Sequence, residues 1–422
     1  MFALVDCNSF FCSVEKVFHP GLEGRPVVVL SNNDGCIVAL TVEAKRLGLK
    51  RGDPYFKVKD VIHAGGGRVF STNMQLYAAM SKRIVSILRK SLTHVEQYSI
   101  DEAFCDLGGY ERYHDLEDLM RKMVCKIKLA TDIPVSVGIA PTKTLAKVAN
   151  KFAKRYEGYR SVCRIDNEYK RRKALSLTSL SDIWGVGRQT LAKLKRLGVH
   201  TPLDFADKSE SWVRRHFNKP GVQTWMELNG HPCIDTTETA RNRTICTSRS
   251  FGEMVSDWES VKSAIAAFAS SCASKLRAQR AGAKSVTVFL ASNRFREDLP
   301  QYSNAATQTF ITPTSDTIEL TQAALALAKQ MYQPGIRYKK AGVILGDIVD
   351  TAALQMHFFD AIPNRKQRSA LMKTIDDLNQ RYGLKTIRLL AEGEQQQPWQ
   401  SKGEYRSQNY LTNIHEILTV KI

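Results

Sequence analysis

Three acidic residues at two places in the sequence could together bind a divalent cation. Asp6 ends the short apolar run Phe2–Val5, and Asp101 and Glu102 are adjacent within SIDEAF, residues 99–104. Side chains alternate between the two faces of a strand, so neighbouring acids share a face only where the backbone turns. Paired charges near a core are costly unless something compensates them. If the strand that ends at Asp6 pairs beside this turn, the three carboxylates converge at one end of a sheet.

This set of ligands favours magnesium and phosphoryl transfer. Mg²⁺ takes oxygen ligands, typically a couple of carboxylates together with substrate phosphates. The nine histidines are scattered and the nine cysteines contain no Cys-x-x-Cys pair, so we place no metal on nitrogen or sulfur. Two Mg²⁺ ions at the acids would support two-metal phosphoryl transfer. The alternative is that the acids are ordinary turn and strand-end residues.

The segments that must position these acids alternate between strands and helices. Apolar residues at helical spacing predict a helix within residues 71–92, directly before the acidic turn. A further helix is predicted over 116–130, a buried strand over 133–140, and a helix over 141–155 that Pro141 and Thr142 open. Together these segments predict an α+β domain built around a mixed sheet.

A glycine hairpin farther along the chain suggests a phosphate-binding site. Gly185 and Gly187 flank Val186 in front of an amphipathic helix whose exposed side begins at Arg188. Such a hairpin presents backbone N–H groups at a helix N-terminus, where a nucleic-acid phosphate binds without its base being recognised. The alternative is a plain helical hairpin with a solvated basic face.

The overall charge also points to nucleic acid. The 422 residues carry a formal charge of +19 and are 43% hydrophobic, which is enough for substantial cores in more than one domain. A polyanionic partner is expected, with an acidic membrane as the weaker alternative. No apolar run approaches the roughly 20 residues of a membrane span, and Asp6 interrupts the first apolar stretch, so we expect a cytoplasmic protein without a signal peptide.

Seven motifs follow one another along the chain: MFALVDCNSFFCSVE, RPVVVLSNNDGC, EAKRLGLKRGDPYF, YSIDEAFCDL, VGIAPTKTLAKVANKFAK, DIWGVGRQTLAKLKRLGV and CTSRSFGE. In this order they resemble the motifs of the Y-family DNA polymerases. The resemblance covers essentially the whole chain, and it is strongest for the UmuC-type catalytic subunits, which share SNNDGC, KAGVILGD and a segment beyond residue 350.

The resemblance implies an α+β, multidomain, right-hand polymerase fold. It would have a ferredoxin-like palm, small fingers, a helical thumb with a helix-hairpin-helix, and an α+β little finger. The implied boundaries are 1–10 and 72–164 for the palm, 11–71 for the fingers, 165–235 for the thumb, 240–349 for the little finger, and 350–422 for a C-terminal partner-binding segment.

The resemblance also implies roles for individual residues. Asp6, Asp101 and Glu102 would be the catalytic, metal-binding acids, with the Cys7 carbonyl as a backbone ligand. Nucleotide contacts would come from Phe10, Phe11, Lys45 and Lys154, with Phe11 at the sugar-discriminating position; Gly185, Gly187 and Arg188 would contact DNA. Phe11 could instead be a core aromatic, and either lysine a solvated helix charge.

The implied activity is that of an error-prone translesion DNA polymerase in SOS mutagenesis and DNA damage tolerance. It would add dNTPs to the primer 3′-hydroxyl of primer-template DNA with two Mg²⁺ ions. A UmuD-like dimer and a RecA filament are implied as partners. The residues Gln355, Met356, His357, Phe358 and Phe359 resemble the peptide that binds the sliding clamp, although these side chains could instead pack on the chain's own surface.

Two other classes of protein account for part of the pattern. A nucleotidyl cyclase also uses carboxylates and metal, but it would carry a Gly-Gly-Asp/Glu-Glu-Phe hairpin in place of SIDEAF. A non-enzymatic DNA-binding accessory factor explains the charge and the glycine hairpin, yet leaves the three acids without a role. Primer extension distinguishes all of these hypotheses.

Overall fold

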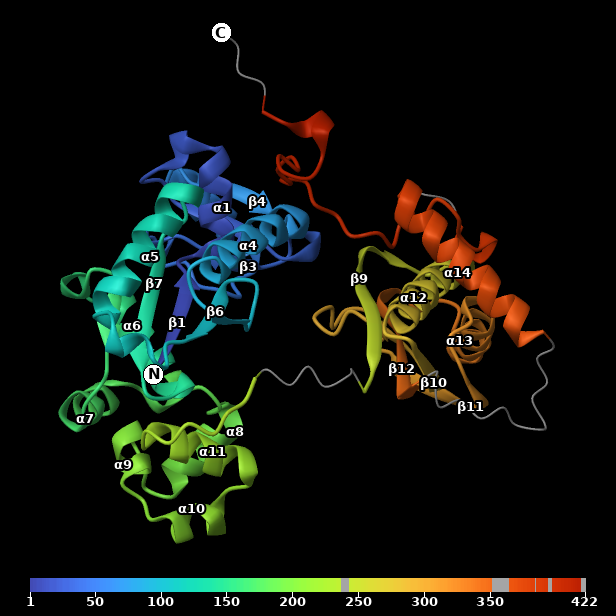
Figure 1. Cartoon of the computed structure of the whole chain (residues 1–422). Coiled ribbons are helices and arrows are strands. Elements are labelled where there is room, and N and C mark those ends of the chain that lie inside the picture. The colour runs from blue at the N-terminus through green and yellow to red at the C-terminus, as the bar shows by residue number, and fades with distance from the viewer. Residues whose placement is uncertain (237–242, 351–363, 384, 394–396, 419–422) are drawn as a thin grey trace. The chain divides into compact units, whose positions relative to one another are not determined.

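The computed structural model describes residues 1–236, 243–350, 364–383, 385–393 and 397–418. The chain divides into two compact units (Figure 1). The first unit comprises Met1–Ser31, Gly35–Thr239 and Tyr405–Ile422, and the second comprises Asn32–Asp34 and Ala240–Glu404. Each unit is larger than one predicted domain, so the finer domain boundaries stay predictions.

A five-stranded sheet forms the centre of the first unit. Its strand order is β5-β6-β1-β7-β8, and all neighbours are antiparallel except β7 and β8. The strands are β1 (Phe2–Cys7), β5 (His94–Gln97), β6 (Glu102–Asp106), β7 (Val135–Ala140) and β8 (Val162–Arg164). The strand that carries Asp6 therefore pairs with the strand that follows the acidic turn, which is the condition for the three carboxylates to converge.

Helices cover both faces of this sheet. Ala3 and Val5 of β1 join the core beneath three helices, whereas Leu4 faces the opposite side and packs with a fourth helix. Because side chains alternate, Asp6 shares the face of Leu4. The first three helices are α1 (Phe10–Phe18), α4 (Met74–Arg89) and α5 (Leu116–Thr131), and the fourth is α6 (Lys143–Arg155).

Two smaller structures complete the first unit. A three-stranded sheet of order β3-β2-β4 has its own apolar core. A group of helices after β8 shares a core with α6. The strands of the small sheet are β2 (Val27–Leu30), β3 (Ile37–Leu40) and β4 (Arg68–Ser71), and the helices α2 (Val42–Arg46) and α3 (Tyr55–Ala64) lie between β3 and β4 in the sequence. The helices after β8 are α7 (Glu168–Leu177), α8 (Arg188–Arg196), α9 (Pro202–Ala206), α10 (Glu210–His216) and α11 (Lys219–Leu228).

The second unit is an antiparallel sheet with two helices on one face (Figure 1). Its strand order is β11-β10-β12-β9, and alternate residues such as Val286, Val288 and Leu290 point into the core beneath the helices. The elements are β9 (Ile245–Val255), α12 (Trp258–Ala278), β10 (Ala281–Ser292), β11 (Ser303–Thr314), α13 (Thr317–Met331) and β12 (Tyr338–Asp350).

The C-terminal residues add to both units. In the second unit, α14 (Arg365–Tyr382) forms ion pairs with α12 and the start of α13, through Asp376 to Arg277 at 2.6 Å and through Arg368 to Asp316 at 2.7 Å. Trp399 is buried in that unit's core. Residues 405–418 belong to the first unit. Among the described residues, no helix is long and apolar enough to cross a membrane.

Candidate active site

A tight turn between β5 and β6 accommodates the two adjacent acids, Asp101 and Glu102. The Ser99 hydroxyl accepts hydrogen bonds from the backbone N–H groups of Asp101 and Glu102, at 3.2 and 3.0 Å, and donates to Asp101 Oδ1 at 2.6 Å. The N–H of Tyr98 closes the turn on the carbonyl of Glu102 at 3.0 Å. Asp101 therefore lies in the turn and Glu102 begins the strand, so the two side chains need not alternate as in a regular strand.

Strand pairing brings Asp6 to the same place. Asp6 and Glu102 are opposite each other in the β1–β6 ladder, so their side chains share one face of the sheet. The N–H of Cys7 donates to the carbonyl of Asp101 at 2.9 Å, which fixes the turn against the end of β1. The three predicted catalytic acids are thus gathered at one end of the five-stranded sheet.

Helix α6 contacts this end of the sheet very closely. Gly138 on β7 permits the approach, because a Cβ at this position would lie 2.1 Å from the carbonyl oxygen of Ala146. The side chain of Asn150 then donates to the carbonyl oxygens of Ser136, at 2.7 Å, and Leu4, at 3.4 Å. This packing holds one side of α6 over the acid-bearing face.

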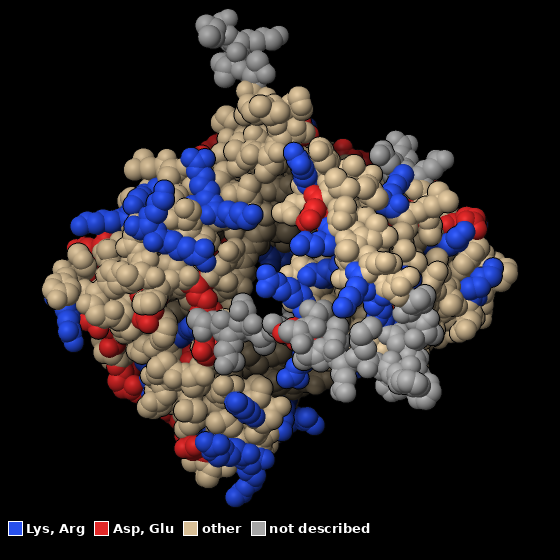
Figure 2. All heavy atoms as spheres, turned by 45° about the vertical axis from the view of Figure 1, so that its right-hand side comes forward, with Lys and Arg blue, Asp and Glu red and all other residues tan. Residues whose placement is uncertain are grey.

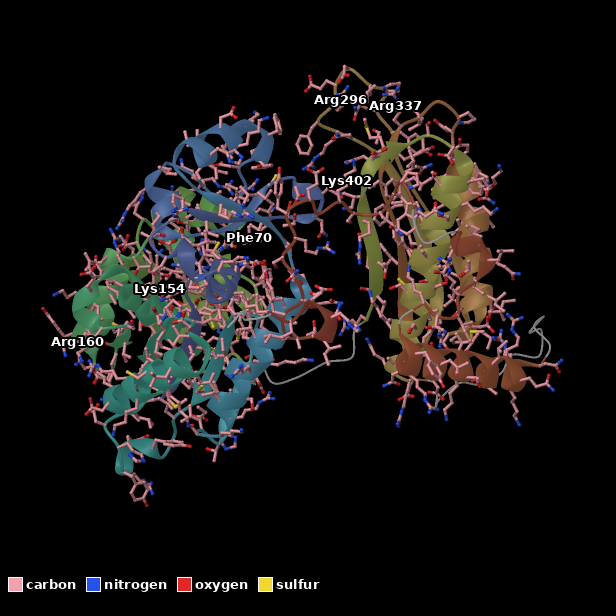
Figure 3. The ribbon with its side chains drawn as sticks, turned by 90° about the horizontal axis from the view of Figure 1, so that it is seen from above. Phe70, Lys154, Arg160, Arg296, Arg337 and Lys402 are labelled. Carbon is pink, nitrogen blue, oxygen red and sulfur yellow. The ribbon has the colours of Figure 1, made fainter. Side chains whose placement is uncertain are left out.

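Two lysines on α6 bind the acids directly. Lys154, labelled in Figure 3, forms an ion pair with Asp6 Oδ1 at 2.5 Å. Lys147 donates to both carboxylate oxygens of Glu102, at 3.0 and 2.8 Å. The two lysines are seven residues apart, about two helical turns, and therefore lie on one side of the helix.

Burial shapes the electrostatics of this cluster. It raises the pKa of Asp6 to about 6; Lys154 partly opposes this shift, and the neighbouring Glu102 and Asp101 charges add to it. Burial also raises the pKa of the Cys7 thiol, with smaller contributions from the nearby acids. The thiol therefore stays protonated, so only the backbone of Cys7 is available as a ligand.

The carboxylates suit a hard divalent cation, although they are arranged around lysines. Within the described ranges, no three His, Cys, Asp or Glu side chains are positioned to hold a metal ion as they stand. Instead, Lys147 and Lys154 form ion pairs with Glu102 and Asp6. The donor set still fits magnesium, because it offers only oxygen atoms and because mutual repulsion among the acids favours a nearby positive charge.

The structure separates the two phenylalanines assigned to the nucleotide. Phe10 is 3% exposed and belongs to the core, which leaves it no face for a nucleotide. Phe11 is only partly buried, at the edge of that core. Its ring stacks on Tyr77, with centroids 4.4 Å apart and an interplanar angle of 17°. Lys45 lies exposed on α2.

The glycine hairpin is present, and of its two glycines only Gly185 occupies a position that demands glycine. Gly187 has φ −80°, which any residue can adopt, and a Cβ there would meet nothing within 4 Å. Gly185 is the demanding position, with φ +90° and a would-be Cβ 2.5 Å from Thr224 Oγ1. Gly187 immediately precedes Arg188, the first residue of α8, and leaves the helix N-terminus open to a phosphate.

The sequence interpretation missed Lys147 and its surroundings. Besides binding Glu102, the Lys147 ammonium lies 4.7 Å from the ring centroid of Tyr98 and 5.4 Å from that of Trp184. The seven-residue spacing to Lys154 was the available signal, since it places both lysines on one side of the predicted helix. The predicted clamp-binding residues, 355–359, lie outside the described residues.

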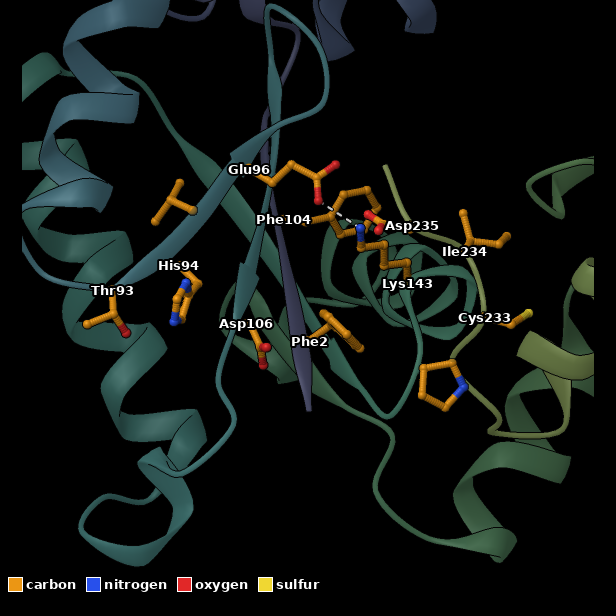
Figure 4. A pocket seen from close by; sticks show the side chains of 12 residues that line it. Phe2, Thr93, His94, Glu96, Phe104, Asp106, Lys143, Cys233, Ile234 and Asp235 are labelled. Atoms are coloured by element: carbon orange, nitrogen blue, oxygen red, sulfur yellow. Dashed lines mark hydrogen bonds and ion pairs between the residues drawn. The ribbon is translucent and has the colours of Figure 1, made fainter. Parts of the chain in front are cut away.

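A pocket of about 590 Å³ lies on the same face of the sheet, at the other end of β6 (Figure 4). Phe2, Phe104, Asp106 and Lys143 are among its lining residues. Lys143 forms an ion pair with Glu96 at 2.7 Å across this pocket. None of the three predicted catalytic acids lines it, so it is distinct from the candidate active site.

Positive charge is spread widely over the protein. Lys and Arg total 61 residues against 42 Asp and Glu. Lys and Arg side chains predominate over acidic ones on much of the face drawn in Figure 2. This surface favours a polyanion, as the composition predicts.

The fold is that of the Y-family DNA polymerases. A Y-family DNA polymerase chimera built on Dbh matches with a TM-score of 0.65 at 22% identity, over 83% of this chain and 100% of that one. The insertion ternary complex of Dbh DNA polymerase matches over the same shares, with a TM-score of 0.53 at 22% identity. These similarities concern the fold.

Sequence comparison defines the family more closely. The model of the impB/mucB/samB family matches residues 5–151, that of its C-terminal domain matches 242–358, and a domain of unknown function matches 369–420. Protein UmuC of Salmonella typhimurium is 42% identical over 100% of both chains, and Protein ImpB of Salmonella typhimurium is 39% identical over 99% of both. DNA polymerase IV 1 of Bacillus subtilis is 26% identical over 91% of both.

The chain therefore belongs to the impB/mucB/samB family, the UmuC-type branch of the Y-family DNA polymerases. The predictions of family, of a right-hand polymerase fold and of a DNA polymerase as the class of enzyme are confirmed. Membership also implies dependence on a divalent metal.

Proposed function

We propose that the chain carries out error-prone translesion DNA synthesis at the acids Asp6, Asp101 and Glu102. It adds dNTPs to a primer 3′-hydroxyl opposite damaged template. The observation that carries this proposal is the convergence of the three carboxylates at one end of the five-stranded sheet. Membership of the UmuC-type family supports the same reaction.

The acids, with the backbone of Cys7, would hold two Mg²⁺ ions. When bound, these ions lower the pKa of the primer hydroxyl and stabilise charge on the leaving pyrophosphate. The chain's own groups position the reactants. The Ser99 turn fixes Asp101 and Glu102, and the β1–β6 ladder fixes Asp6 opposite Glu102. No side chain is assigned as a general base.

The lysines of α6 have two tasks in this proposal. Lys147 and Lys154 neutralise Glu102 and Asp6 and fix the positions of these carboxylates. With Mg²⁺ held by the acids, the same ammonium groups would be available for phosphate oxygens of the substrate, which suits their length and charge. Lys45 on α2 is the further predicted triphosphate contact.

Phe11 selects the sugar in this proposal. A ring packed against C2′ of the incoming nucleotide would collide with a ribose 2′-hydroxyl, and such overpacking costs about 1–3 kcal/mol. This energy corresponds to roughly a tenfold to hundredfold preference for deoxynucleotides. The stacking on Tyr77 supports a fixed ring orientation, because neither ring can rotate without losing the contact.

Primer-template DNA is the substrate, held through its phosphates. The open helix N-terminus at Gly187 and Arg188 is one proposed contact. Exposed basic residues of the second unit offer others, among them Arg296 and Arg337 at one end of that unit (Figure 3). The sliding clamp, through residues 355–359, and a UmuD-like dimer and RecA filament are further proposed partners in SOS mutagenesis.

Primer extension tests the proposed function. The purified full chain, with Mg²⁺ and each dNTP, should extend a primer on undamaged template and on template that carries a lesion. A nucleotidyl cyclase would release a cyclic product without primer, and an accessory factor would bind the DNA without extending the primer. Either result, obtained with chain that binds primer-template DNA normally, would contradict the proposal.

A further inference from the structure

A buried carboxyl group connects Phe11 to the C-terminal residues of the chain. Glu15 lies one turn after Phe11 on α1 and is 0% exposed. The hydroxyl of Tyr77, also fully buried, donates to Glu15 Oε1 at 2.6 Å, while the Tyr77 ring stacks on Phe11. Residues of α1 thus hold Tyr77 at both its ring and its hydroxyl.

Residues 405–410 reach the same carboxyl group from outside. The Ser407 hydroxyl donates to Glu15 Oε1 at 3.0 Å. The other oxygen of Glu15, Oε2, has no hydrogen-bond partner among the residues that the structure describes. Ser407 is therefore the second of two donors that hold this carboxyl group, and Tyr77 is the first.

The same C-terminal residues also hold the start of α4, the helix that carries Tyr77. Asn73 caps α4 by accepting from the N–H of Leu76 at 3.3 Å, and its side-chain amide donates to the Ser407 carbonyl at 3.0 Å. The Tyr410 ring stacks on Phe18 at the end of α1, with centroids 4.7 Å apart. Residues 405–410 therefore contact both helices that meet at the Phe11–Tyr77 stack.

We propose that residues 405–410 position the sugar-selecting ring: Ser407 holds Glu15, Glu15 holds the Tyr77 hydroxyl, and Tyr77 holds Phe11. This inference rests on the proposed sugar selection by Phe11. It gives a role to part of residues 369–420, which match a domain of unknown function. Glu15, Tyr77 and Ser407 are positioning residues, because they act on the nucleotide only through Phe11.

The orientation of the ring is sensitive to these bonds for a simple reason. The hydrogen bond at its hydroxyl and the surrounding core both restrain the Tyr77 ring, so loss of this bond removes one restraint and allows a small shift that the stacked Phe11 ring would follow. A shift of a few tenths of an ångström would relieve the collision with a 2′-hydroxyl but would hardly affect a deoxynucleotide. The expected effect is therefore on selectivity rather than on overall rate.

Single-nucleotide kinetics on the full chain test this proposal. The measured quantity is the ratio of kcat/KM for a dNTP to that for the matching rNTP, because a loss of folded protein lowers both values and cancels in the ratio. The variants Ser407→Ala and Tyr77→Phe each remove one hydroxyl. We expect each to lower the ratio by about two- to tenfold, the range set by the loss of one hydrogen bond. The matched control is Thr412→Ala, which removes an exposed hydroxyl from the same stretch of chain and should leave the ratio unchanged.

The Phe11→Ala variant separates this inference from the proposed function. If Phe11→Ala lowers the ratio but Ser407→Ala and Tyr77→Phe do not, the positioning role is wrong and sugar selection by Phe11 stands. If Phe11→Ala itself leaves the ratio unchanged, sugar selection fails and the positioning role fails with it. In the Phe11→Ala background, adding Ser407→Ala should cause no further loss. An additional, independent loss would show that Ser407 does not act through Phe11.

Discussion

Two buried carboxyl groups of the first unit and two carboxyl groups of the second unit have pKa values shifted in opposite directions. In the first unit, burial raises the pKa of Asp6 to about 6 and that of Glu15 to about 7. In the second unit, burial of Asp316 opposes ionisation, but Arg368 and the amides at the start of α13 outweigh it and lower the pKa. Lys402 likewise lowers the pKa of Glu253. Thus burial dominates at Asp6 and Glu15, whereas cationic partners dominate at Asp316 and Glu253.

The sheets of the two units also differ in how their faces are covered. The five-stranded sheet is covered on both faces, and α6 buries the face that carries Asp6 and Glu102. The four-stranded sheet packs its helices on one face, and Thr287 and Thr307 hydrogen bond to each other on the more exposed face. A covered face strengthens electrostatic interactions and suits chemistry at bound cations, whereas an exposed face suits contacts with a solvated polyanion. We therefore expect mutations on the covered face of the first unit to affect chemistry, and mutations on the exposed face of the second unit to affect DNA affinity.

Removing an acid of the first unit should produce the largest effect. Asp101→Asn or Glu102→Ala should lower nucleotide addition by about 10³-fold or more, because several kcal/mol of charge stabilisation is lost. Primer-template affinity should change little, since the contacts proposed for DNA phosphates involve other residues. The matched control is Asp106→Asn, a charge removal at the exposed far end of the same strand, which should retain activity. Undiminished extension by either active-site variant would show that the residue replaced is not a catalytic acid.

Glu15→Gln should alter the pH dependence of stability. Because the folded-state pKa of Glu15 is raised from 4.5 to about 7, its protonated form stabilises the fold fully below about pH 4.5 and this stabilisation is lost as pH rises through 7. Between pH 4.5 and pH 8, the free energy of unfolding of the wild type should therefore fall by up to about 3 kcal/mol relative to that of the variant. Burial raises the pKa of the neighbouring Cys12 and Tyr77, and also that of Tyr410, so these three groups do not titrate in this window.

Denaturant unfolding at several pH values measures this difference. The free energy of unfolding of the variant minus that of the wild type should increase steadily from pH 5 to pH 8. A difference that stays constant across this range would show that Glu15 is not held protonated by the fold.

Asp316→Asn should show the opposite dependence in the second unit. The lowered pKa of Asp316 means that its ionised form stabilises the fold at neutral pH, and this contribution is lost as pH falls through its folded-state pKa. Asparagine keeps the helix cap but loses the ion pair with Arg368, so the variant should be about 1–2 kcal/mol less stable at pH 7. The deficit should shrink on acidification. A deficit that is the same at pH 3 and pH 7 would contradict the assignment to charge.

Some of this organisation was predictable from sequence and some was not. The turn at SIDEAF and the helix over 141–155 follow from local patterns, because apolar periodicity and turn residues report local backbone structure. The pairing of β1 with β6 joins distant residues, and the sequence offered it only as the condition for the three acids to converge. The demand for glycine at Gly185 depends on Thr224, a residue distant in sequence. The bond between Ser407 and Glu15 joins residues 392 apart, and no local pattern encodes such a contact. Lysines such as Lys147 resemble solvated helix charges until the fold places them on an acid.

Lys340→Ala should produce the smallest effect, and it tests whether the exposed face of the four-stranded sheet in the second unit contacts DNA. Lys340 is exposed on β12, on the opposite face from the buried Val343 and Leu345, and its ammonium lies 5.7 Å from the ring centroid of Phe289. If this face contacts DNA phosphates, the variant should bind all DNA sequences severalfold more weakly, and the slope of log affinity against log salt should fall by about 1. Nucleotide addition at saturating DNA should be unchanged, because no acid of the first unit is replaced.

The matched control is Lys373→Ala on α14, which removes an exposed lysine from a helix of the same unit and should leave the salt slope at the wild-type value. Equal slopes for the two variants would show that the exposed face of this sheet makes no special contribution, and DNA binding would then have to be assigned to basic residues elsewhere on the chain.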